Sequence, residues 1–212
     1  MRIKKIILML IMIFCLNGCV NLDSLEYDDI VNNFSEKAKS TNTYKQGYQY
    51  YIPRGLQIKD SGPNYAIISD GDINYYVYFD LVSYNEKKEI SYELKPSYLY
   101  SKSINSQNKK GYVEIKLWKN NQYLIEIMYN YAKIEVMVDE AFIKEVLINS
   151  INILNSIKYN DIVIESMLSD DNLNYTEEIF DMFEESKDNL DNNENKDEIE
   201  IKDDIQDTDY IN

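Results

Sequence analysis

Short runs of alternating large side chains, separated by turn residues, fill the centre of this chain from Tyr65 to Val138. Successive side chains of a β-strand point to opposite faces, so this alternation predicts strands. Asp70-Gly71, between Tyr65–Ile68 and Ile73–Val82, favours the positive φ angles of a type I′ hairpin turn. We expect further strands at Gly47–Ile52, Leu56–Lys59, Ser91–Leu94, Tyr98–Ser103, Gly111–Trp118, Gln122–Tyr129 and Lys133–Val138, with turns at Asn120–Asn121 and Asn130–Ala132 and a charged loop at Glu86–Glu89.

Two amphipathic segments flank these strands. The first follows the capping residues Asp23 and Ser24 and runs to Lys39, and the second follows Asp139 and runs to Ile157 or Lys158. Their apolar side chains recur at helical spacing, namely Tyr27, Ile30, Val31, Phe34 and Ala38 in the first and Phe142, Val146, Leu147, Ile151 and Leu154 in the second. The sequence therefore predicts one α+β domain at residues 24–160, an antiparallel sheet of about six to eight strands flanked by an N-terminal and a C-terminal helix.

This order of elements resembles that of the Mog1 and PsbP-like sandwich domains, in which terminal helices flank an antiparallel sheet. The resemblance is one of architecture and covers residues 24–160. It implies a two-layer packing of helices on one sheet face. It implies no activity, because one fold supports many functions.

The first residues of the chain have the pattern of an export leader. Arg2, Lys4 and Lys5 precede the uncharged apolar run Ile6–Leu16. This run is too short to cross a bilayer, because a spanning helix needs about 20 apolar residues. We expect residues 1–18 to be removed as a signal peptide, which places the mature chain outside the cytoplasm.

The segment from Leu16 to Cys19 resembles the lipobox of bacterial lipoproteins, in which a small residue precedes an invariant cysteine. Asn17 departs from this pattern, since the residue two positions before the cysteine is usually small. The resemblance implies cleavage between Gly18 and Cys19, a diacylglycerol thioether on Cys19, and acylation of the new amino terminus. Residues 19–23 would then tether the domain to the extracytoplasmic face of the cell membrane. The alternative is an ordinary secretory signal followed by a chance cysteine.

Acidic residues are concentrated at the end of the chain. Residues 161–212 carry 19 Asp and Glu against three Lys, whereas the mature chain before them is close to neutral. High charge with few apolar residues predicts a largely disordered acidic tail, and the near-neutral body argues against nucleic acid as a partner. One apolar island predicts a possible short helix at residues 175–186, which binds a partner groove, packs on its own domain or stays transient. Its apolar face is formed by Tyr175, Ile179, Met182 and Phe183.

Several kinds of chemistry are excluded by composition. The chain has no His, and Cys19 is the one cysteine left when the leader with Cys15 is removed. A Ser-His-Asp triad, a His or Cys metal cluster and an internal disulfide are therefore impossible. An alternating set of oxygen ligands resembles the start of an EF-hand loop, but Tyr175 occupies the position that needs Gly and Asp181 replaces the bidentate Glu. That set is Asp170, Asn172, Asn174, Thr176 and Glu178. We expect no metal, no cofactor and no catalytic residue.

Two features leave a choice between a structural and a functional role. Asp80 lies within the predicted strand Ile73–Val82 and would be a candidate carboxylate if it faced inward, although an outward, solvated Asp fits the usual burial pattern better. Tyrosines recur at period two within strands and can line a surface for glycans, peptides or proteins, although β-propensity explains most of them. They stand at positions 48, 50, 76, 78, 98, 100, 129 and 131.

These observations favour a non-enzymatic role. We expect a membrane-anchored extracytoplasmic lipoprotein that contacts the membrane through lipid on Cys19 and binds an envelope protein or glycan. The alternative is a hydrolase of cell-wall glycan or peptide that uses paired carboxylates. A third reading is a solute-capturing accessory of a transporter, although the chain shows no duplication into two lobes.

Overall fold

The structure is a computed structural model that describes residues 22–169 and residue 183. Gly18 and Cys19 of the predicted lipobox lie outside the described residues, and so does the oxygen-ligand pattern at residues 170–178. The helix predicted at residues 175–186 also lies outside them, apart from Phe183. In the described part of the chain, no helix has the length and apolar character needed to cross a bilayer.

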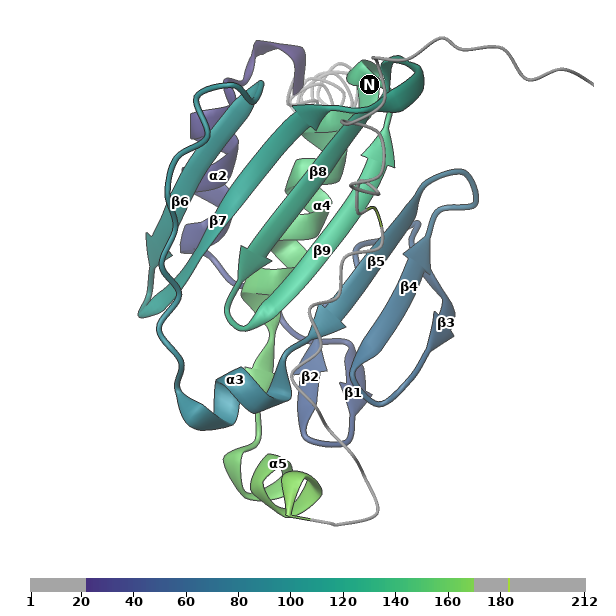
Figure 1. Cartoon of the computed structure of the whole chain (residues 1–212). Helices are drawn as coiled ribbons and strands as arrows, with labels where there is room; N and C mark the ends of the chain where they lie inside the picture. Colours follow the sequence, from purple (N-terminus) through teal and green to yellow (C-terminus); the bar gives the residue numbers. More distant parts are fainter. Residues whose placement is uncertain (1–21, 170–182, 184–212) are drawn as a thin grey trace, which may run out of the picture. The chain divides into compact units, whose positions relative to one another are not determined.

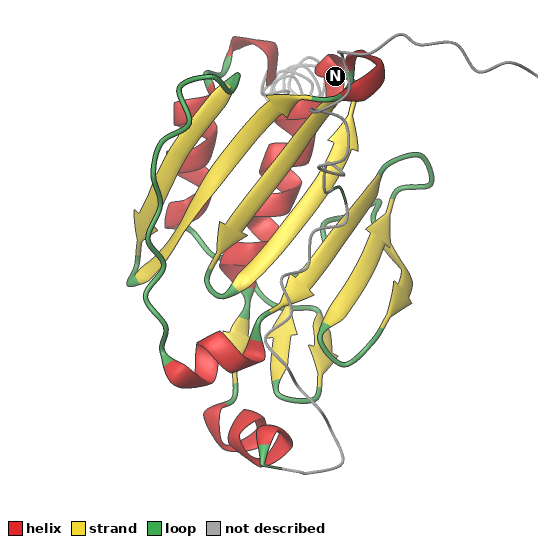
Figure 2. Cartoon of the chain, in the orientation of Figure 1, coloured by secondary structure: helices red, strands yellow, loops and turns green. Residues whose placement is uncertain are grey.

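Two antiparallel sheets form the β-structure of the described domain (Figures 1 and 2). The larger sheet has seven strands in the order β3-β4-β5-β9-β8-β7-β6, and the smaller has three in the order β1-β2-β10. The seven strands are β3 (Gln57–Ser61), β4 (Tyr65–Ser69), β5 (Asn74–Phe79), β6 (Tyr100–Ser106), β7 (Lys109–Leu117), β8 (Tyr123–Tyr129) and β9 (Ala132–Val138). The three are β1 (Thr43–Lys45), β2 (Tyr48–Tyr50) and β10 (Lys158–Tyr159).

Helices α2 (Tyr27–Glu36) and α4 (Ile143–Ser156) lie on one face of the larger sheet (Figure 1). Helix α4 buries Val146, Leu147 and Ile151 completely, in one core with the strand residues Ile125 and Ile134. The predicted α+β class is confirmed, with seven strands in the main sheet and a helix from each end of the domain on it. Two short helices, α3 (Leu81–Glu86) and α5 (Asp161–Leu168), complete the described elements together with single turns of 3₁₀ helix at Leu22–Ser24, Lys119–Asn121 and Glu140–Phe142.

Tight turns join the strands, but the type I′ geometry is not where the sequence predicted it. Of Asp70-Gly71, the glycine alone has a positive φ, because the Asp70 carboxylate accepts the backbone N–H groups of Asp72 and Ile73 and holds a longer loop. Both central residues have positive φ in the two-residue turns Gln107–Asn108 and Asn130–Tyr131. Asn at these positions tolerates the left-handed region.

The two long helices begin and end differently from the prediction. Helix α2 stops at Glu36 rather than Lys39, because the Asn155 side-chain amide donates to the carbonyls of Phe34 and Ser35 and satisfies the last turn. Asp139 makes no side-chain cap, and a turn of 3₁₀ helix separates it from α4. Phe142 and Ala38, predicted on the buried stripes, are exposed because they lie outside α4 and α2.

The segment between β5 and β6 also differs from the prediction. The strand that contains Tyr76 ends at Phe79, and Asp80 caps α3 by accepting the backbone N–H of Ser83 at 2.9 Å. Residues predicted as loop around Glu86 therefore belong partly to a helix. No strand forms at Ser91–Leu94. Instead the Tyr92 ring stacks on Tyr112 with centroids 4.5 Å apart, which lays this segment over the outer face of β7.

Helix α5 extends the domain beyond Asn160, where the sequence placed the boundary. Its Ile164 and Met167 are buried in the core. The turn between β1 and β2 receives this helix closely: a Cβ on Gly47 would lie 3.0 Å from Ile164 Cγ1, and Gly47 has a φ of +86° that other residues rarely adopt. The first residues of the predicted acidic tail are thus part of the packed domain.

We predict that Ile164→Ala lowers the free energy of unfolding by about 2–5 kcal/mol, because it removes buried methyl groups and leaves a cavity. The matched control is Ile162→Ala on the same helix, where the side chain is 80% exposed and the expected change is below about 0.5 kcal/mol. Urea unfolding followed by far-UV circular dichroism measures both. Equal effects of the two substitutions would contradict the packing of α5.

Candidate ligand-binding groove

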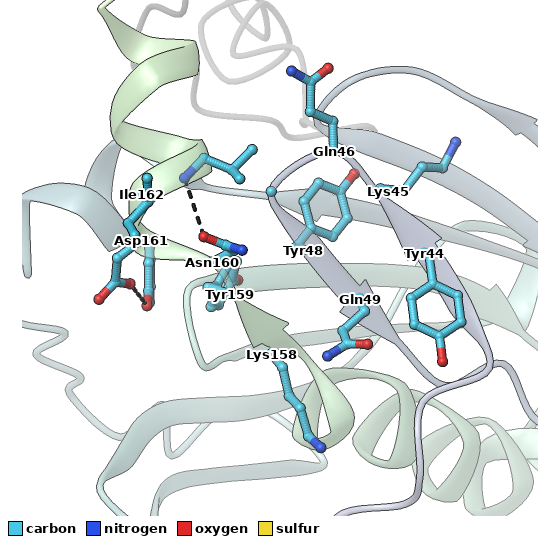
Figure 3. Close-up of a pocket in the computed structure, with 13 residues that line it drawn as sticks. Tyr44, Lys45, Gln46, Tyr48, Gln49, Lys158, Tyr159, Asn160, Asp161 and Ile162 are labelled. Carbon is cyan, nitrogen blue, oxygen red and sulfur yellow. Dashed lines mark hydrogen bonds between the residues drawn. The ribbon is translucent and has the colours of Figure 1, made fainter.

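An open groove of about 920 Å³ lies where the small sheet meets α5 (Figure 3). Its lining comes from distant parts of the chain: residues 44–49, Tyr84 of α3, and residues 158–163. The rim carries two of the most exposed apolar side chains in the described residues, Tyr44 at 71% and Ile162 at 80%.

Tyr159 anchors the groove to the larger sheet. Its hydroxyl group lies 2.9 Å from the carbonyl oxygen of Asn130 and 3.0 Å from that of Tyr131, the two residues of the β8–β9 turn. The hydroxyl is buried, although part of the ring reaches the groove, and burial raises the pKa of Tyr159 well above its ordinary value. Strand β10 is therefore held by the turn of a neighbouring hairpin.

Tyr84 connects α3 to α5. Its ring stacks on Tyr159 with centroids 4.0 Å apart, and its hydroxyl donates a hydrogen bond to the Asp161 carboxylate. The Lys87 ammonium lies 3.7 Å from the centre of the Tyr84 ring and 3.9 Å from Asp161. Burial and then the bond to Asp161 raise the pKa of Tyr84. Asp161, the first residue of α5, is thus bound by Tyr84 and Lys87.

The strand register places three side chains in a row on the outer face of the small sheet. Tyr44 of β1 pairs with Gln49 of β2, and Gln49 pairs with Lys158 of β10. Figure 3 shows the three side by side. The opposite row, Tyr48 and Tyr159 with Lys45, faces inward, where the Tyr48 ring lies 4.2 Å from that of Phe79.

The residues singled out from the sequence have mostly structural roles. Asp80 is a helix cap rather than a catalytic carboxylate. Of the period-two tyrosines, Tyr48, Tyr50 and Tyr129 are buried in the core, which agrees with the structural explanation. Tyr48 also lines the groove, together with Tyr44, Tyr84 and Tyr159, which the sequence did not single out. No spacing pattern links these three.

Three glutamates that sequence reasoning also missed lie opposite one another across β7, β8 and β9. Glu114 pairs with Glu126, and Glu126 pairs with Glu135. Glu126 accepts a hydrogen bond of 2.6 Å from the Tyr112 hydroxyl, and Glu135 lies 3.1 Å from the Lys133 ammonium. The three glutamates are brought together by the register of the paired strands and not by their spacing along the chain. Within the described ranges, no set of three or more Asp, Glu, His or Cys residues is arranged to hold a metal ion.

Comparisons with known proteins give little further information. No protein-family model matches the chain, and no curated protein matches it. Among solved structures, it is similar to the solution structure of cyanobacterial PsbP (CyanoP) from Synechocystis sp. PCC 6803, at 11% sequence identity and a TM-score of 0.32. The match covers 68% of this chain and 99% of that chain. A TM-score this low supports no inference about function.

We predict that Glu114 makes the stability of the protein depend on pH. Burial raises the pKa of this carboxyl above its ordinary value of 4.5, an effect partly opposed by a hydrogen bond from Tyr92. The folded state then binds more protons than the unfolded chain, so stability falls as pH rises from 4.5 through the raised pKa. Glu114→Gln removes this titration, and the variant should gain stability relative to the natural chain as the pH rises above 4.5.

Urea unfolding of both chains over this pH range measures the difference. Glu93→Gln is the matched control, because Glu93 is exposed on the segment that carries Tyr92. Its curve should run parallel to that of the natural chain. A Glu114→Gln curve that also runs parallel would show that Glu114 is not desolvated.

Proposed function

We propose that this protein is an extracytoplasmic lipoprotein, anchored through lipid on Cys19, whose domain binds another component of the cell envelope without enzymatic activity. The leader supports the location and the anchor, and the groove supports binding. Cys19 stands three residues before Leu22, where the described chain begins. A tether of that length spans about 10 Å when extended, so the anchor would keep the domain close to the membrane.

The exposed rim of the groove is the observation that carries the binding proposal. Tyr44 and Ile162 expose most of their side chains to solvent on well-formed elements, one on an edge strand and the other on α5. Aromatic and aliphatic groups beside polar ones are typical of surfaces that recognise a partner. The groove is built on a rigid frame, because Tyr159 and Tyr84 fix β10 and α5 to the rest of the domain.

The carboxylates favour binding over hydrolysis. A glycosidase needs two carboxyl groups on either side of one scissile bond. Among the described residues that line the groove, Asp161 is the one carboxylate, and Tyr84 and Lys87 engage it. The Glu114–Glu126 pair lies elsewhere, on the sheet face that Tyr92 and Tyr112 cover. We therefore favour a binding function over hydrolysis of cell-wall glycan or peptide.

We predict that Cys19→Ser moves the protein from the membrane to the soluble extracytoplasmic fraction, because it removes the sulfur that carries the lipid. Fractionation of cells that express either form measures the distribution, and mass spectrometry of the natural protein identifies the modified amino terminus. Asn17→Ser is the companion variant, since it restores the small residue usual at that position and should leave lipidation intact. An unmodified natural chain that begins at another residue would contradict the anchor.

We predict that a photoreactive phenylalanine analogue at position 44 crosslinks an envelope component in intact cells, because this side chain stands at the rim of the groove. The same analogue at position 117 is the control, since Leu117 is also well exposed, at 59%, but does not line the groove. Adding Ile162→Asp should lower the yield at position 44 by disrupting the apolar rim. Equal yields at positions 44 and 117 would refute a binding role for the groove.

A further inference from the structure

The outer face of the small sheet presents an aromatic ring, an amide and an ammonium group side by side. Tyr44, Gln49 and Lys158 occupy directly paired positions on β1, β2 and β10. Directly paired side chains have Cβ atoms about 4.5–5.5 Å apart, so one small ligand can contact all three. All three side chains line the groove (Figure 3).

Tyr44 offers a flat apolar surface. Its side chain is 71% exposed, and it makes no hydrogen bond, ion pair or ring contact within the part of the chain that the structure describes. Strand β1 is the edge of its sheet, so no neighbouring strand covers the ring from that side. A tyrosine combines an apolar ring with a hydroxyl group that seeks a polar partner.

Gln49 supplies a hydrogen-bond donor next to this ring. Its side-chain oxygen Oε1 accepts a hydrogen bond of 3.2 Å from the Thr41 hydroxyl. That bond orients the amide and leaves its NH₂ group to donate to an acceptor on the ligand. The side chain is half-buried, which limits the conformational freedom that binding would remove.

Lys158 supplies a positive charge that no described acidic side chain pairs with. Its side chain is exposed and forms no ion pair within residues 22–169. A second ammonium, that of Lys109, is close enough for Lys158 to contribute to a lowered pKa there, after the larger effect of burial. The nearest acid of the groove, Asp161, is already engaged by Lys87. The groove therefore has an unbalanced positive charge that suits an anion.

Taken together, these groups select for a particular ligand chemistry. A pyranose ring presents C–H groups on one face, which can stack on Tyr44, and oxygen acceptors along its edge, which can take the Gln49 N–H. A carboxylate on the sugar would complement Lys158. An acidic peptide would satisfy the lysine but not the flat ring, and a polyphosphate would offer charge without an apolar face.

Resting on the proposed binding function, we propose that the groove binds an acidic polysaccharide, with a sugar ring stacked on Tyr44 and a carboxylate paired with Lys158. The test titrates the full-length protein in detergent micelles with a short oligogalacturonate by isothermal calorimetry. The methyl ester of the same oligosaccharide removes the charge and keeps the rings. Short polyglutamate and polyphosphate keep the charge and remove the rings.

Binding of oligogalacturonate should weaken about tenfold in Lys158→Gln and in Tyr44→Ala. Tyr44→Phe keeps the ring and should retain most of the affinity. Lys119→Gln, an exposed lysine outside the groove, should bind as the natural chain does. The ester should bind at least about tenfold more weakly than the acid. Far-UV circular dichroism of each variant confirms that it is folded.

Two outcomes would overturn the proposal. Polyglutamate or polyphosphate binding as tightly as oligogalacturonate would show an anion site without selection for a sugar. Absence of oligogalacturonate binding would refute the acidic polysaccharide as the ligand of the groove. In that case the crosslinking experiment at position 44 separates the two proposals. An adduct there leaves the binding function intact with another partner, and the absence of an adduct refutes both.

Discussion

Helix α4 connects the layers of this domain, and the polar residues at its C-terminal end make the connections. Asn155 donates to the last carbonyls of α2 and accepts a hydrogen bond of 3.0 Å from the Lys109 ammonium of β7. Ser156 accepts the backbone N–H of Tyr51, just after β2, at 2.7 Å. Both side chains are buried. Loss of any of these hydrogen bonds would leave a buried polar group unpaired, which is costly. One turn of helix thus aligns α2, the large sheet and the small sheet.

The groove owes its position to this same junction. The chain passes from Ser156 through Ile157 into β10, and the Asn130 side-chain amide donates to the Ile157 carbonyl at 3.1 Å. The Tyr159 hydroxyl lies within hydrogen-bonding distance of the carbonyl oxygens of Asn130 and Tyr131. Both residues of the β8–β9 turn adopt positive φ, and the Tyr131 carbonyl also accepts the backbone N–H of Asp80 at 2.9 Å. A two-residue turn in the main sheet therefore positions the floor of the groove.

How far the sequence predicts this structure depends on whether a feature is local. Alternation predicted β7, β8 and β9 to within two residues at each end, and the apolar stripe predicted α4, because each pattern reflects one face of one element. Asp80 and Ser91–Leu94 were misassigned because a side-chain cap and a ring stack decide their conformation. The groove could not be predicted, since Tyr44, Tyr84 and Lys158 meet only through strand register and helix docking. The row of Glu114, Glu126 and Glu135 could not be predicted from the sequence for the same reason.

Charge alone would be a poor basis for recognition in this chain. Residues 170–212 carry 17 acidic groups against three lysines, and they are covalently joined to the domain that contains Lys158. An anion attached to the same chain competes with an external ligand without the cost of a second molecule's association. A groove that recognised only negative charge would therefore accept the chain's own carboxylates. Under the proposed binding function, selectivity for an external ligand has to come from the uncharged part of the groove, where the exposed ring of Tyr44 can stack on a flat apolar face that an aspartate or glutamate side chain lacks.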